Sequence, residues 1–213
     1  MISFSALRDV KRLLCIGAHS DDIEIGAGAT VLRILRESPE VEVTWCVLSG
    51  NAMRHKEARR GAKLLLKGCP TKSVILTSFP DALFPENKKQ IKRLFERRLK
   101  PVNPDLILTH SRADAHQDHR VASELTWNTF RSHQIWEYEI PKWDGDLLQP
   151  NLYVPADAGD VSAKISALLD AFGSQRSKHW FDEETFRGLM RLRGLESNVR
   201  YAEAFMARKL VVA

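Results

Sequence analysis

The chain has 213 residues, 44% of them hydrophobic and 28% charged, with a net charge of +5, which is the composition of a folded globular protein rather than a disordered one. No apolar run approaches the roughly 20 residues needed to span a bilayer, and the first residues lack the layout of a secretory signal, so we expect no membrane span and a cytoplasmic location. The three cysteines are scattered and show no paired CxxC spacing, which favours a reducing compartment.

The first 130 residues alternate short apolar runs with stretches of helical periodicity. Strands are predicted at residues 11–18, 41–48, 73–77 and 105–109. Helices are predicted at residues 25–37, 56–67 and 88–100, and from about residue 118. Because the strands are almost wholly apolar, both faces of their sheet should be covered. The alternation predicts an α/β fold, a Rossmann-like three-layer sandwich with a mostly parallel central sheet.

The largest concentration of positive charge lies in residues 88–100, KKQIKRLFERRLK. Its basic residues interleave with apolar ones at helical spacing, which favours an amphipathic helix with a solvated basic face. A nucleic-acid-binding segment would need interleaved aromatic residues or a known binding module, and neither is found. We therefore expect no nucleic-acid partner, while an anionic substrate such as a nucleotide-linked sugar stays open.

After residue 130 the strict alternation ends. Strands are predicted at residues 135–140 and 151–154, with a last one at residues 209–212. Helices are predicted at residues 162–172 and 183–192. No repeat, low-complexity tract or long linker divides the sequence, so we predict one domain over residues 1–213.

The first chemically dense segment is AHSDDIE, residues 18–24, directly after the first predicted strand. Ligands of open parallel sheets bind beyond the carboxyl ends of the strands, and this many chargeable side chains in one turn need a compensating partner. A divalent metal would compensate them, because a neutral imidazole and a carboxylate suit zinc. The adjacent aspartates should point in different directions, so one would bind the metal and the other would act as a base.

A helix cap at Ser20 or Asp21 is the plain alternative for this segment. Capping explains an aspartate, but not its combination with His19. A dinucleotide-binding turn fails as a third interpretation, because the glycines that follow lack G-x-G-x-x-G spacing directly after the strand.

The second dense segment is HSRADAHQDHR, residues 110–120, which follows the fourth predicted strand. It should emerge at the same edge of the sheet as the first segment. His116 and His119 are three residues apart, so at the start of a helix they lie near one face. One can bind a metal while the other stays near a bound substrate. A polar loop with a cap at Asp118 is the alternative, but two such segments at equivalent strand ends favour a shared site.

Together, AHSDD and HQDH resemble the A-H-P-D-D and H-x-D-H motifs of the PIG-L/LmbE-like family of zinc de-N-acetylases. The segments RHKEARRGAKLLL, PNLYVP, GSQ and YAEAF are similar to further parts of that family, so the resemblance covers most of the chain. Ser20 stands where the family usually has proline, which affects the rigidity of the turn. The resemblance implies Zn²⁺ as the cofactor, with His19, Asp22 and His119 as its ligands.

The resemblance also implies catalytic roles. Asp21 would be the general base, His116 in its protonated form would stabilise the tetrahedral intermediate, and Asp118 would orient His116 and tune its charge. Zinc would bring the pKa of a bound water towards about 7. Arg54 and Arg120 are further candidates for gripping substrate hydroxyls or phosphate.

These motifs predict a zinc-dependent hydrolase that removes an N-acyl group, usually acetyl, from an amino-sugar-containing substrate. The substrate would be an N-acetylated sugar, a glycoconjugate or a nucleotide sugar. Zinc-dependent hydrolysis of a non-sugar amide is an alternative, and so is a non-catalytic sugar- or nucleotide-binding α/β domain. A metallo-β-lactamase-like HxHxDH loop is disfavoured, because Asp114 replaces its first histidine and the pattern is not β-rich.

The rim of such a site should come from residues 51–54, 80–85 and 136–150. The last of these is rich in Trp and Tyr, which suits stacking on a sugar ring or, equally, packing over the sheet. The sequence does not decide whether the sugar is free, nucleotide-linked or lipid-linked, nor the oligomeric state.

Overall fold

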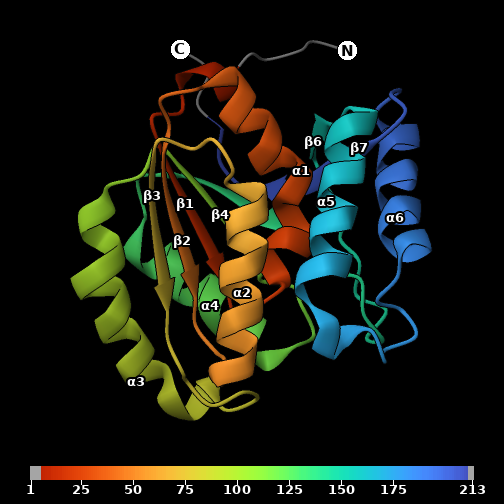
Figure 1. Cartoon of the computed structure of the whole chain (residues 1–213). Coiled ribbons are helices and arrows are strands. Elements are labelled where there is room, and N and C mark those ends of the chain that lie inside the picture. The colour runs from red at the N-terminus through yellow and green to blue at the C-terminus, as the bar shows by residue number, and fades with distance from the viewer. Residues whose placement is uncertain (1–5, 211–213) are drawn as a thin grey trace.

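The fold is centred on a single sheet. The computed structural model describes residues 6–210, and within them a seven-stranded sheet has the order β3-β2-β1-β4-β5-β7-β6 (Figure 1). The strands are β1 (Arg12–Gly17), β2 (Glu42–Val47), β3 (Thr71–Leu76), β4 (Leu106–His110), β5 (Gln134–Tyr138), β6 (Leu152–Pro155) and β7 (Ala202–Ala207). The first five pair in parallel, and β7 is antiparallel to both β5 and β6. The predicted mostly parallel sheet is confirmed.

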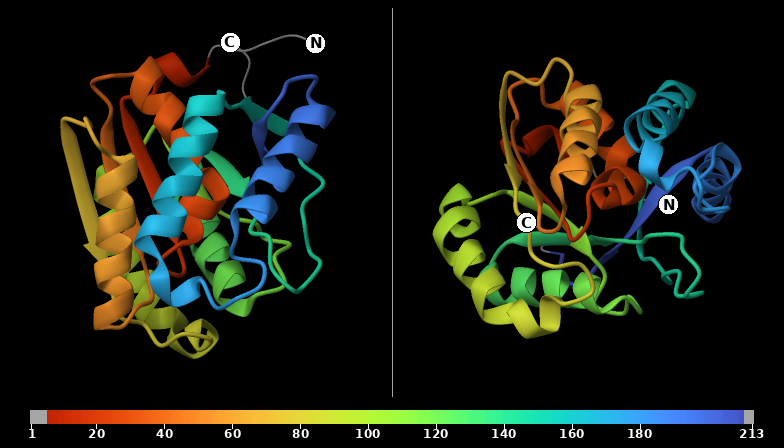
Figure 2. Two further views of the ribbon diagram at one scale, coloured as in Figure 1. Left: turned by 45° about the vertical axis from the view of Figure 1, so that its right-hand side comes forward. Right: turned by 60° about the horizontal axis from the view of Figure 1, so that its bottom comes forward.

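Helices cover both faces of this sheet (Figure 2). The α-helices of the described residues are α1 (Asp22–Glu37), α2 (Ala52–Leu65), α3 (Phe84–Leu94), α4 (Gln117–Thr129), α5 (Ala158–Ala171) and α6 (Glu183–Glu196). Short helical turns are η1 (Ala6–Asp9), η2 (Phe95–Leu99), η3 (Lys100–Val102) and η4 (Gly173–Gln175). Helices α3 and α4 pack on one face, and α1, α2, α5 and α6 on the other, so the predicted three-layer sandwich is confirmed.

The central strands are apolar throughout because each of their faces has its own core. Along β1, Leu13 and Cys15 belong to the core beneath α1, α2, α5 and α6, whereas Leu14 and Ile16 belong to the core beneath α3 and α4. Successive side chains of a strand point to opposite faces. A strand covered on both sides therefore has no position for an exposed polar residue.

The last predicted strand is wrong. Lys209 and Leu210 lie outside any strand, and residues 211 and 212 lie outside the described part of the chain. The observed strand is β7, which inserts between β5 and β6. Its sequence AEAFMA is rich in alanine, a residue with a low preference for strands. Pairing on both edges and burial, rather than local preference, stabilise this strand.

Two chain segments meet where the strand order reverses. After β1 the chain builds β2 and β3 on one side, and it then returns to place β4 on the other side of β1. The turns that follow β1 and β4 therefore lie side by side at the carboxyl edge of the sheet, which is the usual position of ligand sites in this architecture. Within residues 6–210, no helix combines the length and apolar character that a membrane crossing needs.

Candidate active site

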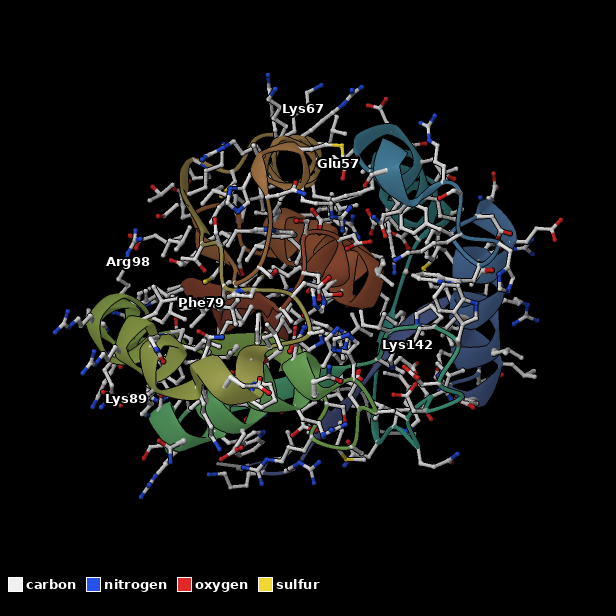
Figure 3. The ribbon with its side chains drawn as sticks, turned by 90° about the horizontal axis from the view of Figure 1, so that it is seen from below. Glu57, Lys67, Phe79, Lys89, Arg98 and Lys142 are labelled. Atoms are coloured by element: carbon white, nitrogen blue, oxygen red, sulfur yellow. The ribbon has the colours of Figure 1, made fainter. Side chains whose placement is uncertain are left out.

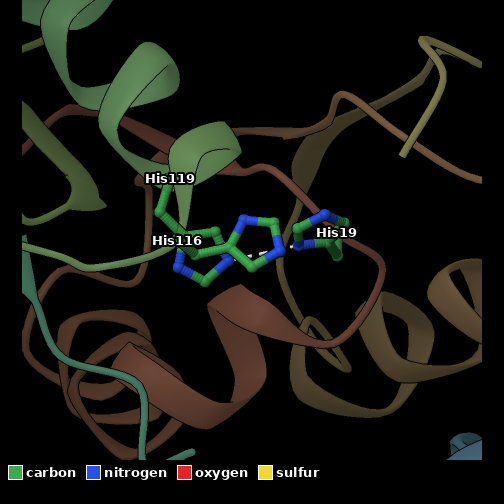
Figure 4. A group of neighbouring side chains, drawn as sticks. All are labelled: His19, His116 and His119. Atoms are coloured by element: carbon green, nitrogen blue, oxygen red, sulfur yellow. Dashed lines mark hydrogen bonds between the residues drawn. The ribbon is translucent and has the colours of Figure 1, made fainter. Parts of the chain in front are cut away.

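The two dense motifs converge on one point at this edge. His19, from the turn after β1, faces His116 and His119 at the start of α4 (Figure 4). The Nδ1 atom of His19 lies 3.2 Å from Nε2 of His119 and 3.4 Å from Oδ2 of Asp22. The same His119 nitrogen lies 3.6 Å from this Asp22 oxygen. Three predicted metal ligands therefore place their donor atoms in one small triangle.

This triangle has the dimensions of a zinc site. Tetrahedral zinc ligands about 2.0–2.1 Å from the ion lie about 3.3–3.4 Å from one another, close to the three distances above. Two imidazole nitrogens and one carboxylate oxygen are also a donor set that zinc accepts. The residues present therefore fit the metal that the motif implies.

Charge in the cluster favours the forms that bind a cation. Burial alone would raise the pKa of Asp22, but His119, His110 and His19 together lower it well below its usual range. Burial lowers the pKa of His119 to about 4, which keeps that ring neutral at physiological pH. Metal ligands must be an ionised carboxylate and neutral imidazoles, and Asp22 and His119 meet this condition. Burial alone would lower the pKa of His19, but the neighbouring carboxylates, Asp22 foremost, raise it well above its usual range, so a metal ion has to displace a proton from this ring.

His110 lies directly behind the triangle. It is fully buried, and its Nε2 accepts a hydrogen bond from the backbone amide of Ala18 at 2.9 Å. The same nitrogen lies 3.1 Å from Oδ2 of Asp22, so Asp22, His110 and His119 form a second group with metal-ligand spacing. Because the amide of Ala18 already occupies the Nε2 lone pair, His19 is the better third ligand.

Carboxylates contact the outer ring nitrogens of both histidines of the triangle. Oδ2 of Asp114 lies 2.9 Å from Nδ1 of His119, and its Oδ1 lies 3.1 Å from Nζ of Lys142. Oδ2 of Asp118 lies 3.3 Å from Nε2 of His19. Metal-binding histidines commonly donate their second ring N–H to a carboxylate, which fixes the ring and raises its basicity.

Asp118 is oriented differently from the role that the resemblance implies. Its carboxylate accepts hydrogen bonds from the amides of Ala82 (2.7 Å) and Phe84 (3.0 Å), besides contacting His19. Only its backbone reaches His116, through an N–H that donates to Nδ1 at 3.2 Å. The carboxylate therefore orients His19 and anchors the loop before α3, where Ala82 has a φ of 62°.

Asp21 faces the cavity beside the triangle. It occupies the N-cap position of α1, yet its side chain makes no capping hydrogen bond. Its Oδ1 instead accepts a hydrogen bond from Nη2 of Arg54 at 2.6 Å. Burial raises the pKa of Asp21, and the Arg54 charge partly offsets that shift. The capping interpretation of this motif therefore does not describe the side chain.

Arg54 reaches Asp21 because α2 begins earlier than the sequence pattern indicates. The side chain of Asn51 caps the helix by accepting from the Arg54 amide at 3.0 Å, so Arg54 lies in the first turn. Its guanidinium also donates to Glu57 at 2.7 Å and to Oγ of Ser174 at 3.1 Å. These contacts tie α2 to the segment after α5.

His116 stands at the N-cap of α4, with its ring 4.9 Å from that of His19 and 4.7 Å from that of His119. Since Nδ1 accepts the Asp118 amide, the proton of the neutral ring resides on Nε2. Burial, and then the charge of His19, lower the pKa of His116. A neutral ring that donates from Nε2 is therefore favoured over the protonated ring that the motif suggests.

These side chains open into a cavity of about 680 Å³. Its floor holds His19, Asp21, Asp22, His116 and His119. Its walls come from three segments: Ser49, Gly50, Asn51 and Arg54; Ser78, Phe79, Pro80 and Asp81; and Ile140, Lys142, Trp143 and Asp144. All three predicted rim segments contribute side chains.

A fourth wall segment was not predicted. Gln175, Lys178 and Trp180 line the cavity from the connection between α5 and α6. The only sequence signal there was the GSQ resemblance, which carries no dense group of chargeable residues. Arg120, in contrast, is exposed and is not among the lining residues. It donates to the carbonyl oxygens of Asp114 (3.0 Å) and Ala115.

Known proteins share this sequence pattern and fold. The sequence model of the PIG-L family, described as GlcNAc-PI de-N-acetylase, matches residues 14–130. The uncharacterised deacetylase YaiS of Escherichia coli (strain K12) is 30% identical over 171 residues, which is 74% of this chain and 89% of that protein.

Solved structures show the shared fold at lower identity. N,N'-diacetylchitobiose deacetylase from Pyrococcus horikoshii aligns with a TM-score of 0.69 and 22% identity, covering 93% of this chain and 84% of that chain. GalB, a 4-carboxy-2-hydroxymuconate hydratase from Pseudomonas putida, aligns with a TM-score of 0.72 and 17% identity, covering 95% and 98%. The same fold thus hosts more than one reaction. The family match covers more than half of the chain and both motifs, so this chain belongs to the PIG-L family of de-N-acetylases.

Proposed function

We propose that this protein is a zinc-dependent hydrolase that removes the N-acetyl group from an amino sugar. The observation that carries the proposal is the triangle of His19, Asp22 and His119 at the floor of a cavity that also holds Asp21. Family membership supports the deacetylase class, and the donor set supports Zn²⁺ as the metal.

His19, Asp22 and His119 would hold the zinc ion. When bound, zinc polarises a carbonyl oxygen and brings the pKa of water towards about 7. Asp114 and Asp118 would keep the His119 and His19 rings in place through the ring nitrogens that face away from the triangle.

Asp21 is the general base in this proposal. Its buried carboxylate is held by Arg54 at 2.6 Å and would take a proton as a water oxygen attacks the amide carbonyl carbon. Nε2 of His116 would donate to the carbonyl oxygen as negative charge develops on it. When the C–N bond breaks, the amine nitrogen takes a proton from Asp21 or His116, and acetate is the second product.

Polar and aromatic groups in the walls support a sugar as the substrate. Asp81 and Ser49 offer hydrogen-bonding groups, and Trp143 offers an indole face. An N-acetylated sugar, a glycoconjugate or a nucleotide sugar fits these groups. Arg54 would position Asp21 and bind substrate, and Arg120 would support the loop that holds Asp114. A cytoplasmic location and a single domain over residues 1–213 stay predictions.

A screen for amine release tests the proposal. The zinc-loaded protein is incubated with N-acetylated monosaccharides, glycosides and nucleotide sugars, and also with N-acetylated amino acids and polyamines. We expect free amine from at least one sugar, loss of activity with a chelator, and recovery on adding zinc. Release from non-sugar amides alone would contradict the sugar assignment. Release from none of the compounds would contradict the deacetylase proposal.

A further inference from the structure

One side of the cavity combines an aromatic residue of the predicted rim with two residues of the segment that was not predicted. Trp143, Lys178 and Trp180, which we call the indole–lysine wall, line the cavity at the carboxyl end of the sheet. Figure 3 views the molecule from this end and labels two other residues that line the cavity, Phe79 and Lys142. Within residues 6–210, no hydrogen bond, ion pair or ring contact joins these three residues to the proposed metal triangle.

Of the two indoles, Trp143 is exposed at the cavity and Trp180 packs beneath it against the core. Their rings are perpendicular, with an interplanar angle of 88° and 6.1 Å between centroids. Trp180 packs against the core and against Phe181 at 5.8 Å. Trp143 is 64% exposed, and its Nε1 donates to Nδ1 of His179 at 3.4 Å. A large exposed indole held beside a polar cavity is suited to packing against a ring of a ligand.

Lys178 supplies a positive charge next to the indoles. It is half-buried, and its Nζ lies 5.4 Å from the centroid of the Trp180 ring. Its positive charge lines the same cavity as the proposed base Asp21.

The other lining cations already have carboxylate partners. Arg54 pairs with Asp21 and Glu57, and Lys142 pairs with Asp114 and Asp146. Within residues 6–210, Lys178 has no carboxylate oxygen within 4.0 Å.

The lining carboxylates outside the floor are occupied as well. Asp81 contacts His19 at 2.9 Å, and Asp144 lies 3.8 Å from Lys142. Lys178 is therefore the lining cation whose charge stays available for a bound anion.

We propose that Lys178, Trp143 and Trp180 form a subsite for an acidic group carried by the substrate beyond its reacting amino sugar. A phosphate or carboxylate would pair with the Lys178 ammonium, and the ring beside that acid would pack against Trp143. The proposal rests on the proposed deacetylase function and specifies its substrate class. The cavity volume of about 680 Å³ lies within the range of about 300–1,000 Å³ for pockets that enclose drug-sized ligands, so a group besides one sugar ring has room.

Matched glycosides test the subsite. The substrates are the 4-nitrophenyl, 4-carboxyphenyl and 4-phosphophenyl glycosides of N-acetylglucosamine, which differ in the charge of the aglycone, together with the methyl glycoside. We expect the wild type to favour the charged aryl glycosides in kcat/KM. In Lys178→Gln, the ratio of charged to uncharged aryl substrate should fall about fivefold, the size of a partly exposed charge pair. The two charged arms show whether a phosphate or a carboxylate is preferred.

Two control variants separate the local charge from the net charge of the protein. Lys178→Arg should keep the ratio, because it keeps the positive charge. Lys63→Gln removes one exposed positive charge from α2, far from the lining residues, and should also keep it. Trp143→Ala should lower the preference for aryl over methyl glycoside, and Trp143→Phe should retain part of it. An unchanged ratio in Lys178→Gln would overturn the subsite.

A binding measurement separates failure of the subsite from failure of the proposed function. Quenching of tryptophan fluorescence reports binding of the same glycosides to chelator-treated protein, without hydrolysis. Tighter binding of the charged glycosides that depends on Lys178 supports the subsite even if no glycoside releases amine, in which case the deacetylase proposal alone fails. Equal binding of charged and uncharged glycosides would overturn the subsite even in an active enzyme.

Discussion

Buried charge serves two purposes in this molecule, and two regions show the contrast. Lys164 of α5 and Glu203 of β7 are almost fully buried, with Nζ and Oε1 2.7 Å apart. Glu203 also accepts the amides of Ala29 and Thr30 in α1, and Lys164 donates to the carbonyl oxygen of Ile25. Through these bonds the pair joins α5 and β7 to α1.

The cluster at the cavity floor is built differently. His19, Asp22 and His119 direct three electron-pair donor atoms towards one another and towards the cavity. Oδ2 of Asp22 also accepts the backbone amide of His19 at 2.6 Å, but the three atoms still converge on one point. The comparison teaches that burial alone does not identify a functional charge. A charge with all of its partners inside the protein stabilises the fold, whereas converging electron-pair donors are suited to holding a cation.

The largest effect should be on the free energy of unfolding, and it should come from breaking the buried ion pair of Lys164 and Glu203. Glu203→Gln replaces an oxygen acceptor with an NH₂ group that cannot accept from a backbone amide, and it leaves the Lys164 ammonium unpaired. Removing one partner of a buried ion pair typically costs about 3–5 kcal/mol. Urea denaturation should show a decrease of this size in the free energy of unfolding. The protein that remains folded should still bind zinc. Glu42→Gln, an exposed carboxylate on β2, is the control. A loss no larger than in this control would contradict the structural role.

Asp21→Asn tests whether the cavity floor separates a catalytic base from the metal ligands. The amide cannot take a proton from water, so kcat should fall about 100-fold or more. Zinc content should stay at the wild-type value, because Asp21 is not a member of the ligand triangle. Kinetics and metal analysis on the same preparation check both expectations. Full activity would contradict the base assignment, and loss of zinc would make Asp21 part of the metal site.

Asp118→Asn tests which histidine the Asp118 carboxylate serves. If it orients His19, zinc affinity should fall about 10- to 100-fold, as for other partners of ligand histidines. Competition with a chromogenic chelator measures this affinity. Asp170→Asn removes an exposed carboxylate of α5 and serves as the control. Unchanged zinc affinity with a lowered kcat would instead favour action through His116.

Glu57→Gln should have the smallest effect. The Glu57 carboxylate accepts hydrogen bonds from the amide and hydroxyl of Ser174 and from Arg54. The substitution should lower the free energy of unfolding by about 1 kcal/mol. Burial alone would raise the pKa of Glu57, but the Ser174 and Arg54 bonds lower it below its ordinary 4.5.

The lowered pKa of Glu57 determines how its contribution to stability depends on pH. A depressed folded-state pKa means that the stabilisation is present above the ordinary pKa and is lost as the pH falls below it. The stability difference between wild type and Glu57→Gln should therefore be constant from neutral pH to about pH 5 and shrink below pH 4. Denaturation across this range measures the difference, and one that grew on acidification would contradict the sign.

Much of the fold could be predicted because each central strand is an apolar run between helical patterns. Strand β7 could not, since its alanines gain their strand conformation from neighbours on both edges. The start of α2 was missed for a local reason. Asn51 caps it through its side chain, and the helical pattern became clear only from residue 56.

The residues at the floor of the cavity could be predicted because their chargeable side chains are close together in two motifs. Asp114 and Lys142 show the limit, since their contact depends on a loop after β5 that no motif connects to α4. Arg120 was a substrate-binding candidate from the sequence, but it does not line the cavity. It adjoins His119 in sequence, but consecutive residues of a helix point in different directions, and its side chain turns back to the preceding loop.

Zinc binding tests the central claim most directly. Chelator-treated wild type and His119→Ala are titrated with zinc, dialysed and analysed by mass spectrometry for bound metal. We predict stoichiometric zinc in the wild type and its loss in His119→Ala. A wild type that retains no zinc, or a His119→Ala variant that retains as much as the wild type, would contradict the claim that His119 and the turn after β1 share one metal ion.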